Sequence, residues 1–454
     1  MHCPALPQPG RIRACTGPGG VSPLPRLEPE TILINAHQMV TLRGPNRPRV
    51  GADATHLGTV PKGAIAIKDG RILHVGSTEE MLRRCAGSDP AIIDCTGRLV
   101  LPGFVDPHTH VAFAGSREDE LQRKLEGASY LQILKEGGGI LRTTRATRNS
   151  TAEAIAAQTR RRLDAMLATG TTTVEVKSGY GLTTRDEIKS LEVIAQLQKE
   201  HPLRLVPTFL GAHAVPQEYT DRPDDYVTLV VDEMIPRVAA ARLATHCDVF
   251  CEEGVFSVAQ SERVLQAGKD AGLRPRAHID ELVNLGGAEM AARLGAVTVE
   301  HLVCTTDSQV ELLARAGTIG CLLPGTPYML MDGRYPQARR MVQRNLPLAI
   351  ATDCNPNCWI ESMQFIIGLS CMMLRLTPEE AITAATINGA YAVGLGEEVG
   401  SLDVGKRADI LLLDVPTYQH LPYHQGSNAA VLVLKDGKVV VDRRDELHES
   451  GAEP

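Results

Sequence analysis

The sequence has 454 residues, of which 43% are hydrophobic and 22% charged, with a formal net charge of −7. This length exceeds one ordinary domain and suits a large barrel with an attached module. With this mildly acidic charge the chain lacks the excess of basic residues that would attract nucleic acids or anionic membranes. No run of about 18 apolar residues occurs, so no segment is expected to span a bilayer. We therefore expect a small-molecule partner, with neither nucleic acid nor membrane.

The first thirty residues are rich in proline and glycine and lack the apolar stretch of a signal peptide. We expect residues 1–30 to form a disordered tail. The eleven cysteines are scattered, without the paired spacings of a disulfide framework. That usage is typical of a reducing compartment, and we expect the protein to be cytoplasmic.

Short β-rich segments lie near both ends of the chain. ETILINAHQMVTL and GAIAIKDGRILHVG come early, and RADILLLDV and AAVLVLKDGKVVVD come late. The tripeptide KDG, at 68–70 and again at 435–437, is a hairpin signal between strands. We predict that residues 31–101 and 396–446 together build one small β-sandwich domain.

The middle of the chain alternates helices with strands. A helix is expected to open at Ser150, with Glu153 completing a capping box, and to end at Gly170 before the strand TTTVEV. Further helices are expected at about 184–200, 226–243, 257–271, 287–294, 308–316 and 336–345, each leading into a strand. The preceding run RLVLPGFVD brings the number of strands to eight. This order predicts a (β/α)8 TIM-like barrel over residues 102–395.

Working residues of such barrels lie at the carboxyl ends of the strands. Four of the eight strands end in DPHTH, AHIDE, VEH and ATD. Residues two apart on a strand face the same way, so both histidines of DPHTH point into the barrel mouth. With a third imidazole and an aspartate they would hold a divalent ion, which lowers the pKa of bound water towards about 7. The proposed ligands are His108, His110, His278 and Asp353.

Two further strand-end residues have a chemical interpretation. Glu281, three residues after His278, would move the proton, and His301 would polarise the scissile carbonyl. Each motif alone has an ordinary explanation: a His-x-His pair is common on surfaces, and His301 is as readily a core histidine. The joint pattern, inside an independently counted barrel, favours a metal-dependent hydrolase.

This pattern resembles the amidohydrolase superfamily and, within it, the imidazolonepropionase family of histidine degradation. The resemblance runs from about 31 to 442, and its most specific motifs are LPGFVDPHTHVAFAGSRE, LKEGGGI, VEVKSGYGL, FLGAHAVP, HIDEL and ATDCNPN. It implies metal-bound water that hydrolyses the ring C–N bond of 4-imidazolone-5-propanoate to N-formimidoyl-L-glutamate. It implies the same four ligands, with Glu281, His301 and Asp353 as catalytic residues. The implied substrate contacts are Arg117, Tyr130, Tyr180, His213, Glu281, Asn355, Asn357 and Cys358.

The residues support part of this assignment and leave part of it open. A propionate tail needs a cation, and Arg117 follows His110 by seven residues on the same loop. Many amidohydrolases bind two metals through a lysine that ends the fourth strand, but that strand ends here in FCEEG, and Lys177 lies on the second. We therefore expect one divalent ion per subunit, with Zn²⁺ and Fe²⁺/Fe³⁺ both compatible.

Asn357 and Cys358 depart from the family pattern, because many members carry a glycine and a small hydroxyl residue at these positions. Any substrate contact by that hydroxyl is thus in doubt. Two alternative functions remain open, namely another amidohydrolase such as a deaminase or cyclic-amide hydrolase, and a catalytically silent scaffold. A homodimer is expected for a barrel enzyme of this size.

Overall fold

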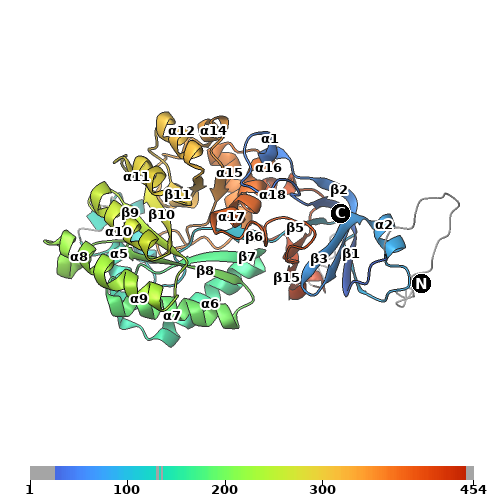
Figure 1. Ribbon diagram of the computed structural model, residues 1–454, viewed down its shortest axis with the longest axis horizontal. Coiled ribbons are helices and arrows are strands. Elements are labelled where there is room, and N and C mark those ends of the chain that lie inside the picture. The colour runs from blue at the N-terminus through green and yellow to red at the C-terminus, as the bar shows by residue number, and fades with distance from the viewer. Residues whose placement is uncertain (1–25, 129–131, 134–135, 446–454) are drawn as a thin grey trace.

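The computed structural model describes residues 26–128, 132–133 and 136–445. The chain forms two separate sheets, one at each end of the molecule in Figure 1. The expected tail falls largely outside the described residues. Its last part is packed, since the Leu27 amide donates to the Arg84 carbonyl (2.9 Å) and the Leu27 side chain is buried.

One sheet is the predicted barrel, with eight parallel strands in chain order. The two end strands approach each other through a bridge between Thr109 and Cys354 and a hydrogen bond from the His110 amide to the Cys354 carbonyl (2.9 Å). The strands are β6 (Phe104–Asp106), β7 (Thr171–Lys177), β8 (Arg204–Ala212), β9 (His246–Cys251), β10 (Arg274–Ile279), β11 (Thr298–His301), β12 (Ile319–Leu322) and β13 (Leu348–Ile350).

Helices surround these strands (Figure 1). Between β6 and β7 lie α3 (Glu118–Leu125), α5 (Gly139–Asn149) and α6 (Ala152–Ala168). The next are α7 (Thr184–Glu200), the 3₁₀ turn η1 (Gln217–Tyr219), α8 (Pro223–Leu229), the π-helix η2 (Val230–Met234), α9 (Ile235–Ala240) and α10 (Val258–Asp270). The rest are α11 (Gly287–Leu294), α12 (Asp307–Ala316), α13 (Gly325–Leu330), α14 (Ala338–Gln343), α15 (Met363–Leu374), α16 (Pro378–Ala384) and α17 (Ile387–Ala392).

Three local predictions are corrected. Thr151, not Ser150, caps α6 by accepting from the Ala154 amide, because the Ser150 hydroxyl donates back to Ala146 of α5. The helix expected over 226–243 is divided by a π segment before Pro236, which has no amide hydrogen to continue the ladder. RLVLPGFVD contributes two strands, and only its second part, β6, belongs to the barrel.

The second sheet is mixed and combines both chain ends, as predicted. Its core draws on both halves of the sheet, including Ile65 and Leu432. Both KDG turns are hairpins, with positive φ at Asp69–Gly70 and at Asp436–Gly437. The strands are β1 (Thr31–Val40), β2 (Thr59–Lys68), β3 (Arg71–Ser77), β4 (Ala91–Asp94), β5 (Leu99–Pro102), β14 (Ile410–Leu413), β15 (Ala430–Lys435) and β16 (Lys438–Asp442), with short helices α1 (Ala52–Thr55), α2 (Thr78–Arg84) and α18 (His420–Tyr423).

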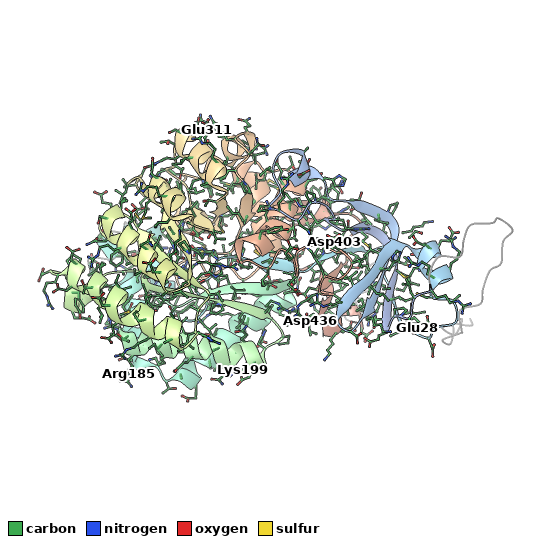
Figure 2. The ribbon with its side chains drawn as sticks, in the orientation of Figure 1. Glu28, Arg185, Lys199, Glu311, Asp403 and Asp436 are labelled. Carbon is green, nitrogen blue, oxygen red and sulfur yellow. The ribbon has the colours of Figure 1, made fainter. Side chains whose placement is uncertain are left out.

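The small domain contacts the amino ends of the barrel strands. The Gly103 amide, just before β6, donates to Asp409 (2.9 Å), and Arg204 at the start of β8 pairs with Asp436 (3.5 Å), which Figure 2 labels. The carboxyl ends of the strands therefore remain available for a site. Among the described helices, none has both the length and the apolar character needed to cross a membrane.

Candidate metal centre and active site

Three imidazoles and one carboxylate meet at the carboxyl ends of the barrel strands. Ring nitrogens of His108, His110 and His278 lie within 4.8 Å of one another. Asp353 Oδ1 lies 3.5 Å from Nε2 of His108 and 3.5 Å from Nε2 of His110. All four side chains are buried. The four predicted ligands therefore come together, from the segments that directly follow β6 and β13 and from β10 itself.

The chemistry of this cluster fits a divalent metal ion. Within the described part of the chain, neither ring nitrogen of His108 has a hydrogen-bond partner, nor has Nδ1 of His110. Leaving such atoms buried and unpaired costs about 1–3 kcal/mol each, so an unmet partner is indicated. Burial lowers the pKa of both histidines well below the usual value, which keeps their lone pairs free. Neutral imidazoles beside a carboxylate are a common donor set for zinc and iron.

A buried ionic network orients one of these imidazoles. Asp248 Oδ1 lies 3.0 Å from Nδ1 of His278, an arrangement in which Nδ1 donates and Nε2 is left to bind a metal. The other oxygen of Asp248 lies 2.8 Å from the ammonium of Lys177, which also pairs with Glu175 (2.9 Å). Sequence reasoning missed Asp248, although a carboxylate inside the apolar strand HCDVFC was a usable signal.

We expect Asp248→Asn to weaken metal binding about 10- to 100-fold, as loss of a ligand-orienting carboxylate commonly does. The amide is a weaker acceptor for His278 and no longer balances the charge of Lys177. Competition with a metal chelator measures the affinity. Asp164→Asn is the matched control, because Asp164 makes the same kind of pair with His201 (3.1 Å) at the surface. Equal affinities in wild type and Asp248→Asn would contradict the role of Asp248.

A proton-transfer pair lies beside the cluster. Glu281, just after β10, has its Oε2 3.4 Å from Nε2 of His301, the last residue of β11. Burial, and next the neighbouring Asp353, raise the pKa of Glu281 to about 8. Burial lowers the pKa of His301 well below its usual value, so its ring is neutral. A carboxyl group with a pKa near neutrality is suited to general acid–base catalysis.

Several residues at the carboxyl ends of the barrel strands adopt strained backbone conformations. His301 has φ 73°, Asp353 φ 50° and Asp280 φ 55°, in the left-handed region that few non-glycine residues occupy. Each such residue costs on the order of 1 kcal/mol, and they concentrate where function fixes a side-chain direction. The backbone conformation at the strand ends, and not only side-chain packing, thus sets the direction of these side chains.

A cavity of about 400 Å³ opens above the cluster. Of the predicted site residues, those that line it are His110, Arg117, Tyr180, His213, His278, Glu281, His301, Asp353, Asn355 and Asn357. His108 is buried beneath it. Cys358 does not line it, because its buried thiol donates to the Thr352 carbonyl (3.6 Å) behind the wall, which argues against the predicted contact. Tyr130 lies outside the described residues.

One wall of the cavity is formed by the aromatic rings of His213 and Tyr180, and its geometry depends on one glycine. The ring of His213 stacks on His110 with centroids 4.9 Å apart, and its Nδ1 bonds the Gly179 carbonyl (2.9 Å). Gly179 has φ 111°, and a Cβ there would lie 2.9 Å from the Leu210 carbonyl oxygen. Tyr180 follows directly and packs edge-on against His213, 5.1 Å between centroids. The SGYG motif therefore places Tyr180 in the cavity wall.

A buried cation faces the same cavity. Arg117 is 5% exposed, and its Nε lies 3.4 Å from Glu120. Its Nη1 has no hydrogen-bond partner among the described residues.

Sequence reasoning did not identify Glu252, whose carboxylate accepts from the Leu282 and Val283 amides (2.9 and 3.1 Å) and fixes the loop after Glu281.

A parallel barrel with a histidine–aspartate cluster at its mouth defines the class of metal-dependent barrel hydrolases. The profile described as "Amidohydrolase family" matches residues 99–440, so the chain belongs to that family. Among its curated relatives are the imidazolonepropionases of Alkaliphilus metalliredigens, 52% identical over 91% of this chain and 98% of that protein, and Symbiobacterium thermophilum, 48% identical over 91% and 97%.

Solved structures support the fold. A zinc-bound adenosine deaminase from Xanthomonas campestris aligns with a TM-score of 0.71 at 20% identity, over 92% of this chain and 94% of that one. Guanine deaminase from E. coli aligns with a TM-score of 0.70 at 16% identity, over 91% and 100%. At these identities the likeness concerns architecture only.

Proposed function

We propose that this chain hydrolyses the ring C–N bond of 4-imidazolone-5-propanoate to N-formimidoyl-L-glutamate in histidine degradation. One observation carries the proposal: a histidine–aspartate cluster and the buried cation Arg117 line a single cavity. The proposed substrate offers a ring carbonyl to the cluster and a carboxylate to the cation. Relatives about 50% identical and named imidazolonepropionase support this choice.

The four cluster residues would hold one divalent ion, either Zn²⁺ or iron. When bound, the ion supplies the Lewis acidity that activates water at neutral pH. A single ion is supported by Lys177, whose buried ammonium already places a positive charge beside Asp248. Asp248, His278 and Glu300 otherwise form a second close group of potential ligands. Elemental analysis is expected to give one equivalent of metal per chain.

The chain's own residues then transfer the proton of the attacking water and stabilise the negative charge that develops on the ring carbonyl oxygen. Glu281 takes a proton from the attacking water and delivers it to the ring nitrogen as the C–N bond breaks. His301, beside Glu281, donates towards the ring carbonyl oxygen as that oxygen gains negative charge. The hydroxyl ends on the carbonyl carbon and the hydrogen on nitrogen, so the new carboxylate and the new N–H group both belong to the single ring-opened product.

The direct test incubates the purified protein with 4-imidazolone-5-propanoate and follows the loss of its ultraviolet absorbance, with elemental analysis of the same sample. Guanine and hydantoin serve as comparison substrates, because another amidohydrolase activity is the nearest alternative. We expect turnover of the imidazolone alone. A metal-loaded protein that hydrolyses guanine or hydantoin instead would overturn the proposal.

Arg117→Met is expected to raise KM for the imidazolone at least about tenfold, with a smaller effect on kcat. Methionine keeps much of the side-chain volume but removes a charge-assisted hydrogen bond worth about 1.5–3 kcal/mol. Steady-state kinetics measure the two constants. Arg142→Met is the control, because Arg142 pairs with Asp119 on the exposed face of α5. An unchanged KM would remove Arg117 from the carboxylate site.

We further propose that the enzyme is a cytoplasmic homodimer. Among the described residues nine cysteines are free thiols, which suits a reducing compartment. Closed symmetric pairs are the commonest oligomers of soluble proteins. Sedimentation equilibrium at micromolar concentration tests the dimer, and a monomeric mass would contradict it.

A further inference from the structure

Helix α3 turns one charged face towards the active site. Arg117 occupies the N-cap position of the helix, and Glu120 and Lys124 follow at spacings of three and four residues, which places the three side chains on one side. Arg117 and Glu120 are buried, and Lys124 is half-buried. Leu125, on another side, is 68% exposed. The helix therefore carries two cations, not one, on its inner face.

Lys124 is held in place by the loop that follows the metal-cluster aspartate. Its ammonium donates to Asn357 Oδ1 (2.9 Å) and to the Met329 carbonyl (3.4 Å). An ammonium has three hydrogens, so one more partner can be bound. The backbone of Asn357 is itself fixed, because its main-chain N–H donates to Asn355 Oδ1 (2.7 Å). Burial and the nearby Arg117 lower the pKa of Lys124, as expected for a cation whose neighbourhood is rich in positive charge.

A second cavity, of about 250 Å³, adjoins the main one at this point. Lys124 lines it, together with Arg117 and Asn357, and the latter two also line the main cavity. Lys124 does not itself line the main cavity, but it bonds Asn357 of the shared wall and so lies beside the end of the main cavity where Arg117 lies. An elongated substrate bound with its ring at the histidine cluster would bring its tail to this end.

The local charge favours an anion. Glu120 is the buried carboxylate between the two cations, and its Oε1 already accepts from the Gly139 amide (2.9 Å). Glu118 also lines the second cavity but is solvent-exposed and bound by Ser116, so water screens its charge. Arg117 and Lys124 carry two positive charges and Glu120 one buried negative charge, which leaves a net positive charge that an anionic ligand can neutralise.

We infer that Lys124 is a second carboxylate-binding residue, which Asn357 positions beside Arg117, and that the pair selects substrates with an anionic tail. The inference rests on the proposed function and deepens it. It also assigns a task to Asn357: its side-chain amide oxygen holds an ammonium rather than contacting the ring.

Kinetics of Lys124→Met on two substrates test this inference. On the imidazolone propanoate we expect KM to rise about tenfold, the loss of one charge-assisted bond, with kcat changed less than about twofold. On its neutral carboxamide we expect kcat/KM to stay at the wild-type value. The matched control is Arg123→Met, which removes a like charge from the same helix at a residue paired with Glu136. Equal losses on both substrates would mean a structural role and overturn the inference.

Binding without turnover separates this inference from the proposed reaction. Calorimetry with imidazole-4-propanoate and 4-ethylimidazole measures the preference for a carboxylate even if the wild type fails to open the imidazolone ring. We expect Lys124→Met to lose about tenfold of that preference and Asn357→Gly a smaller part. An unchanged preference in Lys124→Met would overturn carboxylate recognition. An unchanged preference in Asn357→Gly alone would overturn the positioning role.

Discussion

Replacing Glu281 by glutamine is expected to lower kcat by a factor of about 10³ while leaving the metal content unchanged. Glutamine has the size and shape of glutamate but can neither take a proton from water nor return one to the ring nitrogen. Glu281 Oε2 lies 3.4 Å from His301 and outside the group of His108, His110 and His278 whose ring nitrogens converge. The substitution therefore separates proton transfer from metal binding.

The fold of the glutamine variant should be preserved, because the cost of burying the Glu281 carboxylate disappears. Burial already raises the pKa of this group to about 8, so at pH 7 without a metal ion it is largely protonated and resembles the amide. Single-turnover kinetics and elemental analysis on one preparation test both halves of the prediction. Glu192→Gln, an exposed carboxylate on α7, is the control. Normal turnover by Glu281→Gln would deny Glu281 its catalytic role.

The barrel and the meeting of the candidate ligands could be predicted because both follow from local patterns and one geometric rule. Strand–helix alternation implies parallel strands, and parallel strands bring their carboxyl ends to one edge. His108, His278 and Asp353 each stand at such an end, so their meeting required no knowledge of side-chain packing. The helices at Thr184–Glu200 and Gly287–Leu294 agree with the predicted bounds for the same reason.

Residues whose role depends on tertiary partners were harder to predict. Asp248, on β9, becomes important only because Lys177 of β7 and His278 of β10 reach it across the barrel interior. Thr151 caps α6 in place of Ser150 because the preceding α5 uses the Ser150 hydroxyl. Asn357 and Cys358 are adjacent, yet one lines the cavity and the other is buried behind it. The turn that contains both residues decides which side chain faces the cavity, and the identities of the two residues do not predict this.

Replacing His108 by alanine is expected to reduce bound metal to about a tenth of the wild-type content or less, and activity with it. Metal affinity depends on the number of correctly placed ligands, and Nε2 of His108 lies 3.5 Å from Oδ1 of Asp353 within the cluster. Both ring nitrogens of His108 lack a partner among the described residues, so its removal breaks no hydrogen bond there. The cost to folding is therefore mainly the cavity left behind, about 2–4 kcal/mol by analogy with other large-to-small changes.

His246→Ala is the matched control, since His246 is an equally buried histidine inside the barrel, on β9. It should cost comparable stability but keep its metal, because it is not part of the cluster formed by the ring nitrogens of His108, His110 and His278. Thermal unfolding, elemental analysis and turnover on the two variants distinguish loss of ligation from loss of packing. If His108→Ala stayed fully active without metal, the cluster would not be the catalytic centre, and the assignment of every residue around it would fail.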